Sequence, residues 1–223
     1  TSVVLWTRLA PRPLEAGGGL PEAAIAVDWE IAGDVAMRDI VRRGTALARP
    51  EAGHSIHVLA AGLDPARPYW YRFRAGAAES RIGRTRTLPV PGSEAARFRL
   101  AVASCQRIEQ GHFTAWRDIA GSELDLVLHT GDYIYEYALP GDIDRRMGFA
   151  VPDTVRGKLA ALADYRLRYA LYKLDPDLAA AHAAHPFVTV FDDHEVANDW
   201  AGDGAPRLTR DAFLALRAAA FQA

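Results

Sequence analysis

Residues that could perform chemistry stand at the ends of apolar segments in the second half of the sequence. The clearest case is segment 125–136, in which an apolar run leads into Gly131 and Asp132. A buried parallel strand delivers a carboxylate to the carboxyl edge of a sheet in this way. Because Tyr135 follows three residues after Asp132, a carboxylate and a phenol oxygen could converge there on one hard metal ion.

Two further apolar segments end in polar side chains. Cys105 follows segment 98–104, and Asp193 and His194 follow segment 186–191. Thiolate, phenolate and carboxylate groups are all anionic, so their meeting at one sheet edge requires a cation that neutralises them. Thiolate and phenolate favour a transition metal such as ferric iron, whereas carboxylate oxygen suits calcium, magnesium or manganese. We therefore expect a metal site at this edge.

A bimetallic site of this kind would suit phosphoester hydrolysis. Asp132 can bridge two metal ions, which would polarise a phosphoryl oxygen and generate a hydroxide nucleophile. His194 would donate a hydrogen bond or a proton near the reacting group. The candidate metal ligands are Cys105, Asp132, Tyr135 and Asp193, and the candidate catalytic residues are His194 and Asp132.

Each candidate also has an ordinary structural interpretation. A lone cysteine such as Cys105 is most often a small buried apolar residue. Asp132 after Gly131 could serve a turn or a helix cap, and segment 192–195 could be a solvated charged turn. The occurrence of all three groups at predicted strand ends of one sheet favours a functional site.

Nucleophilic catalysis is the alternative chemistry, with Ser104 or Cys105 as nucleophile and His194 as base. The sequence has no Gly-x-Ser-x-Gly elbow. Cys105 is followed by Gln106, where a nucleophile turn has small residues. These features disfavour that mechanism, and P-loop and dinucleotide-binding glycine motifs are also absent from the sequence.

The elements expected to position these residues form an α/β region over 97–223. Strand 98–104, amphipathic helix 111–120 and strand 124–129 form one β-α-β unit, which places Cys105 and Asp132 at the same end of neighbouring parallel strands. All three strands, including 186–191, should be buried, and segment 138–154 should be a long surface loop. The predicted helices are 158–173, with a stripe of core tyrosines, 175–184, and 210–223 with Thr209 as N-cap.

The first part of the chain reads as a separate β domain over residues 1–90. Short apolar runs alternate with turn residues, as in a fibronectin-like sandwich. Segment 88–94 contains two prolines and a glycine and is the expected linker. The expected strands are 3–9, 25–32, 40–47, 55–61 and 69–75.

Composition excludes several classes of protein. The chain has 223 residues, of which 50% are hydrophobic, and a formal net charge of −2, so it has no basic field for nucleic acid. Cys105 is the only cysteine, which excludes an intrachain disulfide. No apolar run reaches about 18 residues, so we expect no membrane-spanning helix. The start at Thr1 lacks a signal peptide and favours a processed or excised piece.

Several segments together resemble the alkaline phosphatase D (PhoD-like) family of metallophosphatases. The segments that carry the resemblance are Ser104-Cys105-Gln106, Gly131 to Glu136, Phe191 to Val196, Val4 to Arg8 and Tyr69 to Phe73. The resemblance implies an α+β chain, with a fibronectin-like β-sandwich followed by part of an α/β metallophosphatase domain of the αββα sandwich type.

The same resemblance implies roles for the candidate residues. Cys105 would be the first ligand, Asp132 the bridging carboxylate, and Tyr135 the ligand of an iron site like that of purple acid phosphatases. Asp193-His194-Glu195 would be the counterpart of the family's Asn-His-Glu motif. The implied activity is hydrolysis of small-molecule phosphate monoesters or diesters with ferric iron and calcium, or another divalent metal, in a secreted or periplasmic protein.

The family's later histidine motifs have no counterpart in these residues. We therefore expect this chain to be the N-terminal part of a longer family member, with an incomplete site. The alternative is a non-catalytic secreted binding module with a degenerate phosphatase domain. Such a module should have lost some candidate ligands, yet Cys105, Asp132, Tyr135 and Asp193 are all present.

Overall fold

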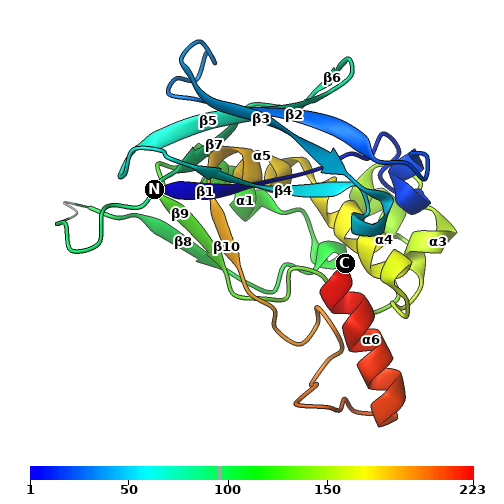
Figure 1. Ribbon diagram of the computed structural model, residues 1–223. Coiled ribbons are helices and arrows are strands. Elements are labelled where there is room, and N and C mark those ends of the chain that lie inside the picture. Colours follow the sequence, from blue (N-terminus) through cyan, green and yellow to red (C-terminus); the bar gives the residue numbers. More distant parts are fainter. Residues whose placement is uncertain (95–96) are drawn as a thin grey trace.

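The computed structural model describes residues 1–94 and 97–223 as an α+β fold, which confirms the expected fold class (Figure 1). Residues 95 and 96, between the two expected domains, lie outside the described residues. The N-terminal part is a β-sandwich, and an α/β region follows it. In the described residues no helix combines the length and the apolar character needed to cross a membrane.

The sandwich consists of two antiparallel sheets. One pairs β1 (Ser2–Arg8) with β4 (Ser55–Ala61). The other has the order β3 (Ile40–Ala48), β2 (Ile25–Ala32), β5 (Pro68–Ala75) and β6 (Ala78–Glu79), with β7 (Gly83–Arg86) also paired to β5. Alternate side chains point inward, as in Val27 and Ile31 of β2, which are fully buried. The predicted period-two pattern of β2 is therefore confirmed.

The α/β region is built on a three-stranded parallel sheet with the order β10-β9-β8. The strands are β8 (Leu100–Ala103), β9 (Leu126–His129) and β10 (Phe187–Thr189). Helix α1 (Thr114–Gly121) connects β8 to β9, and it packs against α5 (Pro176–Ala184). The predicted β-α-β unit is confirmed, because β8 and β9 run parallel from the pair Leu100–Leu126 to the pair Ala103–His129.

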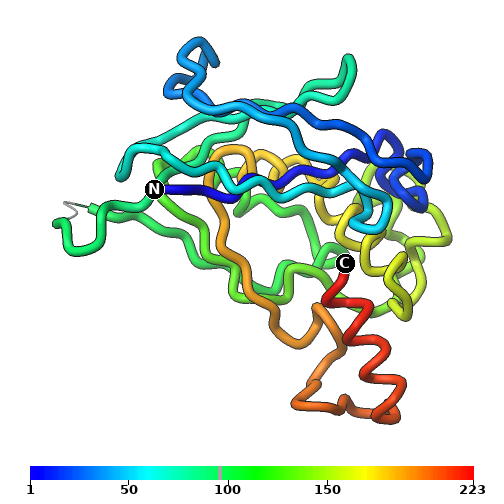
Figure 2. The backbone as a smooth tube through the Cα atoms, in the orientation of Figure 1, coloured from blue at the N-terminus to red at the C-terminus, as the bar shows by residue number. Residues whose placement is uncertain are grey.

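The remaining helices are α2 (Ile143–Met147), α3 (Asp153–Arg156), α4 (Leu162–Lys173) and α6 (Arg210–Gln222), and short 3₁₀ turns occur at Ala16–Gly19, Pro50–Ala52 and Ile108–Gln110. Two predicted helix starts are confirmed. The Thr209 side chain accepts from the Ala212 N–H, and the Asp175 side chain accepts two N–H bonds at the start of α5. Helix α6 and the segment before it extend away from the rest of the chain (Figure 2).

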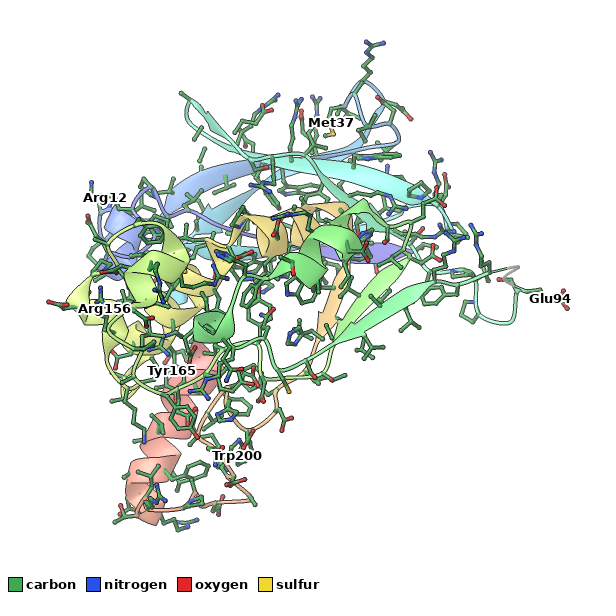
Figure 3. The ribbon with its side chains drawn as sticks, turned by 180° about the vertical axis from the view of Figure 1, so that it is seen from behind. Arg12, Met37, Glu94, Arg156, Tyr165 and Trp200 are labelled. Atoms are coloured by element: carbon green, nitrogen blue, oxygen red, sulfur yellow. The ribbon has the colours of Figure 1, made fainter. Side chains whose placement is uncertain are left out.

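The tyrosine stripe on α4 belongs to the core, as predicted. Tyr165 and Tyr172 are fully buried. The Tyr165 hydroxyl donates to the Val196 carbonyl at 2.7 Å, which ties α4 to the segment after β10 (Figure 3). Trp200 in that segment packs on Phe213 of α6. Helix α4 thus supports the chain that leaves β10.

Three expectations about this region are wrong. The strands of the parallel sheet are not buried on both faces, because Val102 and Val188 are 61% and 48% exposed and helices α1 and α5 lie along one face. Segment 138–154 is more than a surface loop, since it contains α2 and the start of α3 and buries Ile143 and Val151. The helix expected from residue 158 begins at Leu162.

The sandwich and the α/β region contact each other directly. The Arg84 guanidinium on β7 donates to the carbonyls of Leu124 and Ala184 at 3.2 and 3.4 Å. The Lys173 ammonium at the end of α4 lies 4.8 Å from the centroid of the Trp6 ring on β1. It also donates to the Tyr133 hydroxyl at 3.3 Å. Cationic side chains therefore bridge the two parts of the chain.

Candidate metal centre

The predicted convergence of the segments after β8 and β9 is present in the structure. The Cys105 N–H donates to the Gly131 carbonyl at 3.2 Å, and the Gln106 N–H donates to the Asp132 carbonyl at 3.1 Å. These bonds continue the parallel pairing past the strand ends. Cys105 and Asp132 therefore lie side by side at the carboxyl edge of the sheet, as the β-α-β unit predicts.

The backbone at this edge adopts unusual conformations. Cys105 and Asp132 have φ values of 58° and 56°, in the left-handed region that costs a residue with a side chain about 1–2 kcal/mol. Gly131 has a φ of 106°, and a Cβ there would collide with Asp192, whose backbone nitrogen would lie 2.5 Å away. Gly131 thus allows the segment after β10 to approach the segment after β9. Strain of this kind concentrates at functional sites.

Three of the predicted residues form a cluster that fits a cation. One potential ligand atom each from Asp132, Asp193 and His194 lies within 4.8 Å of the others. The Tyr135 hydroxyl donates to Asp132 Oδ2 at 3.1 Å. Asp132 Oδ1 is buried and has no hydrogen-bond partner in the described part of the chain. A buried carboxylate oxygen without a partner is costly, and a metal ion would satisfy it.

Tyr135 and Cys105 lie beside this cluster, although Cys105 is not one of the three residues whose ligand atoms converge within 4.8 Å. Burial, the Asp132 carboxylate and the neighbouring Cys105 thiol together raise the pKa of the Tyr135 phenol. Without a cation the phenol is therefore protonated, and a bound metal would reverse this preference. Cys105 is exposed, so the interpretation of this cysteine as a buried apolar residue is wrong. Thiol, phenol, carboxylate and imidazole groups thus occur at one edge and fit a metal centre.

Glu195 fixes the position of the turn after β9 relative to the segment after β10. Its side chain is 1% exposed, and its Oε2 accepts from the N–H groups of Asp132 and Asp192 at 3.0 and 2.7 Å. Its Oε1 accepts from the Tyr133 N–H. Burial raises the pKa of Glu195, while these backbone N–H groups lower it. Glu195 therefore joins the turn after β9 to the segment after β10.

Glu136 orients the imidazole of His194. Glu136 is buried, and its Oε2 lies 2.8 Å from His194 Nδ1. The Asn198 N–H donates to Oε1 of the same carboxylate at 3.0 Å. The imidazole also packs on the Tyr135 ring, with centroids 4.3 Å apart. Because the carboxylate engages Nδ1, Nε2 is the nitrogen that remains for chemistry.

Two residues directly after Cys105 extend the site. The Gln106 amide donates to the Tyr133 carbonyl and accepts from the Trp116 indole, so it locks both strand ends to α1. The Arg107 guanidinium lies 5.4 Å from the Tyr135 ring centroid and pairs with Glu109. Arg107 therefore places a positive charge beside the acidic cluster.

Gln106, Glu136 and Glu195 belong to the family-like motifs but had no separate predicted role, and Arg107, two residues after Cys105, was not singled out from the sequence. Position near a predicted ligand was the available signal, because a supporting carboxylate and a solvated one have the same appearance in a sequence.

Comparison with known proteins adds an independent observation. Residues 100–223 match the family described as PhoD-like phosphatase, and residues 1–89 match the PhoD-like phosphatase N-terminal domain. The chain is 48% identical over 223 residues to alkaline phosphatase D of Bacillus subtilis (strain 168), and covers 38% of that protein. A solved structure titled "Structure of PhoD" matches 99% of the chain at 47% identity with a TM-score of 0.91, and the chain covers 42% of it. The chain thus spans about two fifths of the length of these relatives.

Proposed function

The chain belongs to the PhoD-like phosphatase family, and on this basis we propose that it carries part of the active site of a metal-dependent phosphoester hydrolase. The observation that supports this proposal most strongly is the cluster of Asp132, Asp193 and His194, together with the buried, unpaired Asp132 Oδ1. An anionic cluster of this kind is suited to binding cations that in turn bind a phosphate.

We propose Cys105, Asp132, Tyr135 and Asp193 as the metal ligands, with Asp132 in the bridging position. The thiol and the phenol suit ferric iron, whereas the carboxylates suit calcium or another divalent ion. When bound, such ions polarise the phosphoryl oxygen and supply an activated water as nucleophile. Glu195 holds the backbone of Asp132 and Asp192, so the ligands need little rearrangement.

His194 is proposed to assist the leaving group. As water attacks phosphorus and the ester P–O bond breaks, the departing oxygen gains negative charge and takes up a proton. His194 can donate that proton from Nε2, because Glu136 holds Nδ1 and stabilises the protonated ring. The Arg107 guanidinium beside Tyr135 can compensate part of the phosphate charge.

The proposed substrates are small-molecule phosphate esters, and the proposed location is outside the cytoplasm, as the family resemblance implies. The competing proposal is a secreted binding module with a degenerate phosphatase domain. Retention of all four candidate ligands, and of the Glu136 and Glu195 carboxylates behind them, supports the enzyme over the binding module.

Substitution of Asp132 tests the proposal. The assay compares hydrolysis of p-nitrophenyl phosphate and bis-p-nitrophenyl phosphate by this chain, and by a chimaera in which the remaining part of the B. subtilis relative follows Ala223. Asp132→Asn should abolish turnover of both esters, whereas Asp118→Asn on the exposed face of α1 should leave it unchanged. Undiminished turnover in Asp132→Asn would show that Asp132 is not the bridging ligand.

A further inference from the structure

An arginine-lined cleft lies between the sandwich and the α/β region, at the sheet edge opposite the candidate metal centre. It encloses about 640 Å³. One wall comes from β5 and β7, and the other from the turns that enter β8, β9 and β10, which include Arg99, Asp125 and His185. These turns precede the strands, whereas Cys105 and Asp132 follow them. The cleft is therefore separate from the metal centre. Strand β7, which supplies Arg84 and Arg86 to the cleft, lies beside α5 (Figure 1).

The walls of the cleft carry an excess of positive charge. Four arginines and two carboxylates line it, namely Arg84, Arg86, Arg97, Arg99, Glu123 and Asp125. Two arginines are neutralised in part, because Arg86 pairs with Asp125 at 2.8 Å and Arg99 pairs with Glu123 at 3.2 Å. Low-dielectric walls around charges of one sign focus their field into the cleft.

Several donors in the cleft remain available for a ligand. Among the described residues, the hydrogen bonds of the Arg84 guanidinium go from one terminal nitrogen, Nη1, to the backbone carbonyls of Leu124 and Ala184. Arg97 is an exposed residue of the lining. His185 does not add a donor: its Nε2 donates to the Ile119 carbonyl at 2.8 Å, so Nδ1 of the neutral ring is an acceptor, and the arginines carry the affinity for an anion.

A β ladder positions two of the side chains on one wall. Trp70 and Arg84 are directly opposed on the paired strands β5 and β7, so the β ladder positions the indole and the guanidinium. Val35 and Ile82 add apolar surface beside them. A cleft with planar guanidinium donors on two sides and an aromatic ring on one wall fits an anion with several oxygens.

We propose that this cleft is a second anion site, which binds a multiply charged phosphate such as a tripolyphosphate chain, free or as part of a nucleotide. Guanidinium groups from β7 and from the residues before β8 donate hydrogen bonds to the phosphate oxygens. The site does not depend on the proposed hydrolytic activity. Because the arginines come from both parts of the chain, a bound anion joins the sandwich to the α/β region.

Calorimetric titration of tripolyphosphate into metal-stripped protein tests the site, since removal of metal suppresses binding at the other edge. Arg97→Gln/Arg99→Gln should weaken binding at least about tenfold, which corresponds to loss of charged hydrogen bonds to phosphate. The control Arg12→Gln/Arg43→Gln makes the same change in net charge at exposed positions outside the cleft and should retain the affinity within about twofold.

A variant expected to bind tripolyphosphate more tightly distinguishes a specific effect from a loss of binding caused by misfolding. Glu123 is 86% exposed and holds Arg99, so Glu123→Gln frees a guanidinium and should tighten tripolyphosphate binding severalfold. A parallel titration with ATP identifies the source of the phosphate. If ATP binds more tightly than tripolyphosphate and Trp70→Leu removes the difference, the ligand is a nucleotide. If ATP and tripolyphosphate bind with equal affinity, the site recognises the phosphate chain alone. No saturable binding, or equal loss in the control pair, would overturn the proposal.

Discussion

The contacts of Glu195 make a quantitative prediction about stability. Its carboxylate accepts from the backbone N–H groups of Asp132, Tyr133 and Asp192 while almost fully buried. In Glu195→Gln, the amide oxygen can replace only one of the two carboxylate oxygens. The NH₂ group takes the place of the other oxygen, so a donor faces a backbone N–H donor and that N–H loses its acceptor. Weakened charge-assisted bonds and one unpaired buried donor cost about 1–3 kcal/mol each. We expect a loss of about 3 kcal/mol in the free energy of unfolding.

Urea denaturation of the metal-stripped chain measures this loss without interference from metal binding. Glu123→Gln is the matched control, because Glu123 pairs with Arg99 at the surface and should change the free energy of unfolding by less than about 0.5 kcal/mol. If Glu195→Gln and the control had the same urea midpoint, the inferred role of Glu195 as the structural link between the two segments would be refuted.

Two further predictions concern Gly131 and Lys173. Gly131→Ala combines an unfavourable φ with the collision at Asp192, so thermal unfolding should show a loss of about 2–4 kcal/mol in the free energy of unfolding. In the control Gly121→Ala the added Cβ meets no atom within 4 Å, so this variant should not show that loss. The Lys173 side chain lies beside Trp6 and Tyr133, and the Tyr133 hydroxyl also contacts His182. Burial lowers the pKa of Lys173 to about 8. The unfolded lysine binds its proton up to about pH 10.4, so the unfolded state binds more protons from pH 8 upwards and stability rises with pH. From pH 7.5 to 9.5 the stability of the wild type should rise by about 1–2 kcal/mol relative to Lys173→Met, and Lys158→Met, at an exposed position, should keep the wild-type profile. If the free energy of unfolding of Lys173→Met rose with pH as steeply as that of the wild type, this prediction would be contradicted.

Local and periodic features of the fold could be predicted from the sequence. The bounds of β2, the start of α5 near Asp175 and the N-cap at Thr209 depend on residue alternation and on side chains close to the helix start, and all are present. The meeting of Cys105 and Asp132 also follows from one β-α-β unit, because chain topology alone sets it.

Features that depend on distant contacts could not be predicted. Apolar residues such as Val102 indicate a strand with two apolar faces, but the sequence pattern does not say whether both faces are covered. The role of Glu195 depends on Gly131, which allows two segments about 60 residues apart to touch. The cleft requires Arg84 from the sandwich and Arg99 from the second region, and no sequence pattern links those positions.

Metal content tests the central claim most directly. The chain, Asp132→Asn and the exposed-site control Asp118→Asn are each incubated with ferric iron and calcium, desalted, and measured by elemental mass spectrometry. A metal centre at the carboxyl edge predicts bound metal, about one ion or more per chain, in the wild type and the control, and its loss in Asp132→Asn. Absence of metal from all three proteins, or equal metal in Asp132→Asn, would contradict the account.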